Sequence, residues 1–93
     1  MLDGIALTDV AASRALLVTR GKLRAAASRC AEASVDFGHV LGEAGDKQAL
    51  FGRAVCRQKL GDEAGAHADL ERYRREFPGD PAAHDLERLL SPP

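Results

Sequence analysis

The stretch KQALFGRAVCRQKLGDEAGAHADLERYRREFP, residues 47–78, decides the fold of this chain. Near its middle, Gly61 tolerates the left-handed backbone that ends a helix, and Asp62 is a residue that caps the next one. Apolar residues in its second half recur every three or four positions, as on one helical face: Ala66, Leu70, Tyr73 and Phe77. The stretch therefore predicts two antiparallel helices, over residues 47–60 and 63–77, because so short a turn places them side by side.

The sequence before this stretch predicts two further helices. Thr8 is a candidate cap for a helix over residues 8–19, and Gly21 is the candidate turn that ends it. A second helix is predicted from Lys22 to a point within residues 36–41, where two glycines weaken the pattern. Because the turn at Gly21 is short, these two helices are also expected to be antiparallel.

The sequence after this stretch predicts a fifth helix, over residues 81–90. Pro78 and Gly79 break the preceding helix, Asp80 is a candidate cap, and Pro81 is favoured at a first helical position. The composition agrees with helices throughout, since 17 of the 93 residues are Ala and 10 are Arg, both strong helix formers. No stretch alternates cleanly between apolar and polar residues as a strand does.

An internal repeat is predicted because Gly21 and Gly61 stand forty positions apart. A shift of forty pairs residues of similar character: Ala26 with Ala66, Cys30 with Leu70, and Phe37 with Phe77. The two hairpins would span about residues 8–38 and 47–79. They are expected to stack, with Ala26, Cys30, Ala66 and Leu70 in the shared core, because one hairpin alone cannot cover its apolar face.

The second hairpin resembles the tetratricopeptide repeat, a helix–turn–helix unit of about 34 residues. The resemblance rests on Leu50 four residues before Ala54, the turn Leu60-Gly61-Asp62, Ala66 four residues before Leu70, and Pro78. It is clear over residues 50–90 and weak over residues 8–37. It implies an all-α fold of two antiparallel helical hairpins plus a C-terminal capping helix, an α-solenoid fragment forming one domain over residues 1–93.

The resemblance also implies a binding groove, because in this family the first helices of successive units line a concave surface. Carried over by position, the partner-binding groove is lined by Ala11, Ala15, Val18, Gln48, Phe51, Val55, Gln58 and Lys59. With Phe51 as its anchor, such a groove suits an amphipathic helix or an apolar segment. The alternative is that Phe51 is an ordinary core residue.

The expected function is therefore a non-catalytic interaction or scaffold module whose partner is another protein or a second copy of the chain. The alternative is a structural terminal domain or a fragment of a larger protein, used for tethering or homo-oligomerisation. No capping element precedes the first predicted helix, so its apolar stripe is expected to pack on a partner or a second copy. Arg20, Lys22, Arg24 and Arg29 have few acidic neighbours in the sequence and are candidates to face an acidic partner or, as the less favoured alternative, a phosphate backbone.

Several function classes are not expected. His39, His67 and His84 have neither the spacing of a helical metal site nor a catalytic neighbour, so no enzyme activity, metal or cofactor is predicted. Cys30 and Cys56 show no metal-binding spacing and suggest small buried residues in a reducing compartment.

The charge and hydropathy argue against two further function classes. A net charge of −1 argues against nucleic-acid binding. No apolar run is long enough to span a membrane, and no secretory signal is visible, so a cytoplasmic location is expected. Abundant Ala and Arg suggest a bacterial genome rich in G and C.

Overall fold

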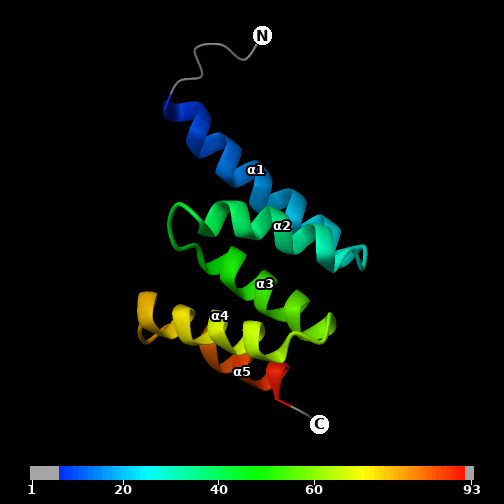
Figure 1. Cartoon of the computed structure of the whole chain (residues 1–93). Coiled ribbons are helices and arrows are strands. Elements are labelled where there is room, and N and C mark those ends of the chain that lie inside the picture. Colours follow the sequence, from blue (N-terminus) through cyan, green and yellow to red (C-terminus); the bar gives the residue numbers. More distant parts are fainter. Residues whose placement is uncertain (1–6, 92–93) are drawn as a thin grey trace.

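The computed structural model describes residues 7–91, with side chains from residue 13 onward, and over these residues it is built from α-helices without a strand (Figure 1). The helices are α1 (Leu7–Ala26), α2 (Cys30–Leu41), α3 (Lys47–Lys59), α4 (Glu63–Glu76) and α5 (Ala82–Leu90). Helices α1 and α2 pack together as one hairpin, and α3 and α4 pack as another. The predicted all-α fold is confirmed.

Helix α3 is the centre of the molecule, because it contacts all four other helices. The two hairpins meet mainly where α2 packs on α3, and α5 closes the far end by packing on both α3 and α4 (Figure 1). The side chains buried at these contacts include Ala33, Phe37, Leu50, Ala54, Ala66, Leu70, Tyr73 and Leu86. Small residues let the helices approach closely, and Phe37 fills the space between the hairpins.

The predicted turn at Gly21 is wrong, because α1 continues through this residue to Ala26. Gly21 has a packing role instead: a Cβ atom added there would lie 2.6 Å from the Phe37 ring. A Cβ atom added at Gly52 of α3 would lie 2.6 Å from the opposite edge of the same ring. The Phe37 side chain is thus held between two glycine-faced helices, where any larger residue would push them apart.

The first hairpin actually turns at Ser28, which has a positive φ of 64°. Its geometry repeats that of the second turn, where Gly61 has a φ of 86°. In each turn a backbone N–H reaches back five residues, from Arg29 to the carbonyl of Arg24 at 2.7 Å and from Asp62 to that of Arg57 at 2.8 Å. Both are the hydrogen bond of a Schellman motif, which the first turn forms without glycine.

The two turns show that equivalent positions lie 33 residues apart, so the predicted shift of forty is wrong. In this register Ala33, and not Ala26, corresponds to Ala66. Both Ala33 and Ala66 are fully buried, whereas Ala26 is exposed at the end of α1. Cys30 and Leu70 are buried as expected, although they are not equivalent to each other.

The predicted cap at Asp62 is confirmed, and Asp46 caps α3 in the same way. The carboxylate of Asp46 accepts a hydrogen bond from the backbone N–H of Ala49 at 2.9 Å at the start of α3. Asp62 accepts one from Gly65 at 2.9 Å at the start of α4. Asp80 accepts a bond from the N–H of Ala82 at 2.9 Å, but Pro81 is the N-cap, because α5 begins one residue later than predicted. Thr8, in contrast, lies inside α1, which begins at Leu7.

Candidate functional site

The first, third and fifth helices together form a hollowed surface. One hollow of about 280 Å³ lies where α1, α3 and α5 meet over α4, and it is lined by Lys22, Lys47, Gln48, Phe51, Gly52, Tyr73 and Ala82. A second, of about 620 Å³, lies between α1 and the start of α3; its lining includes Ala15, Val18, Gln48 and Phe77. Gln48 borders both hollows, so we refer to the two together as the α1–α3–α5 groove.

Four of the predicted groove residues lie in this groove: Ala15, Val18, Gln48 and Phe51. Val18 is buried, while Ala15 and Gln48 are exposed. Phe51 is half-buried, because it packs on the core with part of its surface and lines the smaller hollow with the rest. Phe51 thus belongs partly to the core, and its role as an anchor for a partner stays a prediction. Val55 is also half-buried against the core, and the side chain of Ala11 lies outside the described residues.

The remaining two predicted residues lie away from these hollows. The amide Nε2 of Gln58 donates a hydrogen bond to the carbonyl of Leu90 at 3.3 Å, which ties α3 to the end of α5. Lys59 lines a different hollow, of about 410 Å³, between the turns of the two hairpins, together with Arg29 and Leu60. Gln58 is drawn to the end of α5, whereas Lys59 lies beside the turn of the first hairpin, so neither borders the groove.

Sequence reasoning missed three polar residues that line the smaller hollow: Lys22, Lys47 and Tyr73. Lys22 was assigned to the wrong helix by the false turn at Gly21. In a continuous α1 it stands four positions after Val18 and so shares its face. A predicted helix that continued through Gly21 would have placed Lys22 on the same face as Val18.

Lys47 is held at the edge of the groove by its neighbours. Its Nζ atom lies 2.8 Å from Oδ2 of Asp80 and 5.3 Å from the centre of the Phe77 ring. The hydrogen bond from Lys47 holds the pKa of Asp80 below its ordinary value, because it stabilises the carboxylate. The pKa of the neighbouring Tyr73 is raised, mainly because burial disfavours the phenolate. The groove thus combines an apolar floor with a charged rim.

Each hairpin also contains a buried carboxylate held by two arginines. In the first hairpin, Arg20 donates to both oxygens of Asp36, at 3.1 and 2.8 Å. Arg24 adds bonds at 3.1 and 3.0 Å to the same two oxygens. Asp36 is buried, and the bonds from Arg20 are the main reason that its pKa lies below the ordinary value.

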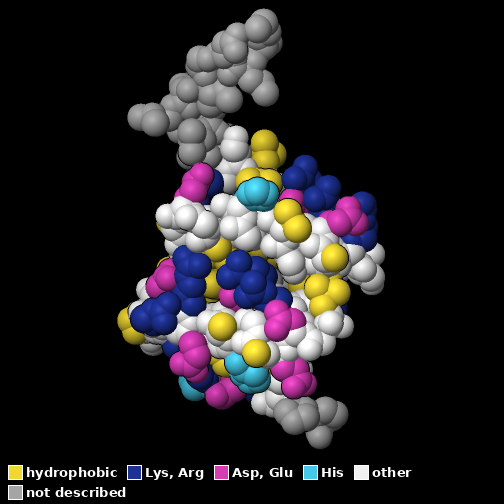
Figure 2. Space-filling view, in the orientation of Figure 1, with side chains coloured by type: hydrophobic (Ala, Val, Ile, Leu, Met, Phe, Trp, Pro, Cys, Tyr) yellow, Lys and Arg dark blue, Asp and Glu magenta, His cyan; other side chains and the backbone are white. Residues whose placement is uncertain are grey.

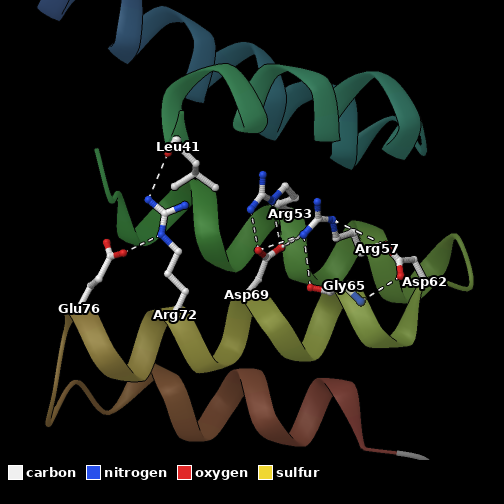
Figure 3. Close-up of polar contacts among 8 residues, drawn as sticks. All are labelled: Leu41, Arg53, Arg57, Asp62, Gly65, Asp69, Arg72 and Glu76. Atoms are coloured by element: carbon white, nitrogen blue, oxygen red, sulfur yellow. Dashed lines mark hydrogen bonds and ion pairs between the residues drawn. The ribbon is translucent and has the colours of Figure 1, made fainter. Parts of the chain in front are cut away.

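The second hairpin repeats this cluster 33 positions later. Arg53 donates to the two oxygens of Asp69 at 3.0 and 2.7 Å, and Arg57 donates to both at 3.1 Å. Figure 3 shows both arginines reaching from α3 to the Asp69 carboxylate on α4. We call the two clusters the Asp36 triad and the Asp69 triad.

The arginines of this face serve the fold itself. Seen from the side of α2 and α4, cationic side chains gather across the middle of the molecule (Figure 2). Beside the Asp69 triad, Arg72 pairs with Glu76 and donates to the carbonyl of Leu41 at 3.1 Å (Figure 3). The premise that Arg20, Arg24 and Arg29 lack acidic neighbours is wrong, because Asp36 and Glu32 bind them within the chain. The two triads could have been found from the sequence, since the pattern Arg-x3-Arg-x11-Asp occurs twice.

The cysteines are buried, whereas the histidines lie at the surface. Cys30 and Cys56 are free and buried. Burial, followed by the interaction with Cys30, raises the pKa of the Cys56 thiol to about 12, so it stays protonated at neutral pH. His39, His67 and His84 are exposed. Among residues 7–91 no three His, Cys, Asp or Glu side chains converge as metal ligands do, and no helix there is long and apolar enough to cross a membrane.

Comparison with known proteins returned no match: no family model, curated protein or solved structure is significantly similar to this chain.

Proposed function

We propose that this chain is a non-catalytic interaction module that binds an apolar or amphipathic helical segment of another protein in the α1–α3–α5 groove. The observation that carries the proposal is the smaller hollow, where three helices meet and Phe51 keeps part of its ring surface accessible. An apolar hollow with a few polar groups at its edge is the usual form of a pocket that accepts an apolar anchor.

The charged rim of the groove supports an amphipathic occupant. Lys22 of α1 and Lys47 of α3 border the smaller hollow on two sides. A helix that inserts an apolar residue beside Phe51 would bring its neighbouring polar residues toward these ammonium groups. Acidic residues flanking the anchor of the bound segment are therefore favoured.

We further propose that the chain is a helical repeat of the tetratricopeptide kind, working in the cytoplasm. The 33-residue spacing of the two turns and the two triads is close to the period of about 34 residues in that family. The order of two antiparallel hairpins and a final helix also supports it. A cytoplasmic location is consistent with two free cysteines, which reducing conditions maintain.

A displayed library of 20-residue peptides tests the groove. Peptides selected on the purified chain are expected to contain apolar residues at helical spacing. Substitution Phe51→Ala, and Gln48→Arg at the exposed border of both hollows, should each weaken binding about tenfold or more by fluorescence anisotropy. The control Val35→Ala alters an exposed apolar residue on α2, outside the groove, and should leave the affinity unchanged.

Circular dichroism checks that each variant remains helical. Gln48 is exposed, so Gln48→Arg reports on the groove even if Phe51→Ala loosens the core. Selected peptides that bind wild type and Gln48→Arg equally well would place the binding surface elsewhere and reject the proposal.

A further inference from the structure

The two cysteines of the chain lie on the two helices that join the hairpins. Cys30 is the first residue of α2, and Cys56 lies in the last turn of α3. Both belong to the hydrophobic core, where Cys30 is 6% exposed and Cys56 is fully buried. The α1–α3–α5 groove is lined by other residues, so the cysteines have no part in the function proposed above.

The packing of α2 on α3 brings the two cysteines toward one place. The ring of Phe37 on α2 meets Gly52 on α3, which fixes a point where the helices touch. Cys30 lies about two helical turns before Phe37, and therefore on the same face of α2. Cys56 lies about one turn after Gly52, on the same face of α3. Because residues 42–46 form a short connection, the helices run antiparallel, and both cysteines lie toward the same end of the interface.

Two further observations agree with this placement. The hollow of about 410 Å³ between the two turns is lined by Cys30 and also by Lys59 and Leu60, so the start of α2 lies beside the end of α3. The thiols also interact directly, since the contact with Cys30 is, after burial, the second cause of the raised pKa of Cys56. Each sulfur is therefore within reach of the other.

The two thiols differ in how a reagent can reach them. Cys30 borders the hollow and keeps part of its surface accessible, whereas Cys56 has no exposed surface. Thiol–disulfide exchange begins with attack by an accessible sulfur. A small disulfide that enters the hollow therefore meets Cys30 first. Cys56 can then react only with the sulfur of Cys30.

We propose that Cys30 and Cys56 form a reversible disulfide that fastens α2 to α3 when a small disulfide, such as glutathione disulfide, oxidises the chain. The sulfur of Cys30 gives up its proton and attacks one sulfur of the reagent. The S–S bond of the reagent breaks, and one glutathione leaves with the proton. The thiol of Cys56 then gives up its proton and attacks the sulfur of Cys30 in the mixed disulfide, so the second glutathione leaves. Two protein thiols are oxidised to one disulfide, and one glutathione disulfide is reduced to two thiols.

The bridge joins the hairpins at the end where their turns lie. It closes the chain between Cys30 and Cys56 into a covalent loop, which restricts the unfolded state. The oxidised chain should therefore unfold about 10 °C higher than the reduced chain. Cytoplasmic disulfides are usually transient and report on oxidants, so such a bridge agrees with the location proposed above. The inference stands whether or not the groove binds a peptide.

Oxidation of the folded wild-type chain with excess glutathione disulfide tests the proposal. The intact mass should fall by two hydrogen atoms, with no glutathione retained. A tryptic digest without reductant should contain peptide 30–47 linked to peptide 54–57. Circular dichroism should show the midpoint of thermal unfolding about 10 °C higher, and dithiothreitol should reverse the change. A chain that stays reduced, forms only covalent dimers, or keeps glutathione on both cysteines overturns the proposal. An unchanged midpoint in the bridged chain shows that the disulfide does not fasten the helices.

Two variants test the order of the steps. Cys56→Ala should stop at the mixed disulfide, with one glutathione on Cys30, because the second thiol is missing. The matched control Cys30→Ala should take up no glutathione while folded, and its Cys56 should react only after urea is added. Equal rates for the two variants without urea overturn the assignment of Cys30 as the first thiol. The wild-type result decides the proposal even if an alanine variant fails to fold.

Discussion

Arg20 and Arg53 make the same pair of hydrogen bonds to an aspartate, but their surroundings differ. The side chain of Arg20 is 55% exposed and that of Arg53 is 16% exposed. Arg53 lies between the two hairpins, and its Nη1 atom would be 3.7 Å from a Cβ atom at Gly38 of α2. Arg20 lies on α1, at the end of the stack. The same local pattern is therefore interior in one hairpin and terminal in the other.

This difference separates what a hairpin makes by itself from what stacking adds. Both triads close within their own hairpin. In each, two arginines one helical turn apart on the first helix reach an aspartate on the second helix, 16 and 12 residues away. Burial of the arginine comes only from the neighbouring hairpin, and it decides how costly the loss of the partner charge becomes. A buried cation that loses its carboxylate destabilises the fold strongly, whereas an exposed side chain can rotate into the solvent.

Removal of the two carboxylates has the largest expected effect. Asp69→Asn should lower the free energy of unfolding by about 3 to 5 kcal/mol, because it leaves Arg53 without its carboxylate between the packed hairpins. Asp36→Asn should cost about half as much, since Arg20 can turn into solvent. Urea denaturation followed by circular dichroism measures both. Equal losses would show that burial of the arginine does not distinguish the triads.

The glycines beside the hairpin interface have the next largest expected effect. Gly52→Ala should destabilise the chain by about 1 to 3 kcal/mol, because the new methyl group meets the Phe37 ring. Gly38→Ala is the matched control on α2: its methyl group has room, and the better helix propensity of alanine should stabilise by up to about 1 kcal/mol. Thermal unfolding of both variants gives the comparison. A stabilising Gly52→Ala would mean that the Phe37 ring has space to move.

Substitutions in the two turns should have the smallest effect on the free energy of unfolding. Ser28→Gly should stabilise the chain by about 1 kcal/mol, because glycine adopts the positive φ of this position without strain. Gly61→Ser, the reciprocal change in the second turn, should destabilise by a similar amount. The midpoints of urea unfolding provide the measurement. If Ser28→Gly instead lowers stability, a contact of the serine side chain outweighs the backbone strain.

The second hairpin was predictable from the sequence because its signals are local. Asp46 and Asp62 cap helices whose start points were predicted correctly, and Gly61 occupies the left-handed position where glycine is favoured. Propensity and turn chemistry act over a few residues, so one sequence suffices to detect them. Part of the groove was also predictable from the sequence, since Gln48 and Phe51 lie on one face of α3.

The first hairpin was mispredicted because glycine has two uses. Gly21 was expected to end a helix, but it lies within α1 to accept the ring of Phe37, 16 positions away in the sequence. The true turn has a serine in the left-handed conformation, stabilised by the same hydrogen bond as the glycine turn. Nothing local separates a glycine that breaks a helix from one that admits an aromatic neighbour. The error also displaced the repeat register and concealed Lys22.

The sequence alone determined the all-helical fold, the hairpin of α3 and α4 and the final helix, because helix propensity, caps and short turns operate within each segment. Only the tertiary structure decided where the first hairpin turns, the role of Gly21, and which residues of α3 face the groove and which face α5. Those features depend on contacts between helices, and such contacts are set by the shapes of side chains that are distant in the sequence. The contact between Cys30 and Cys56 likewise became apparent only when α2 and α3 were packed together.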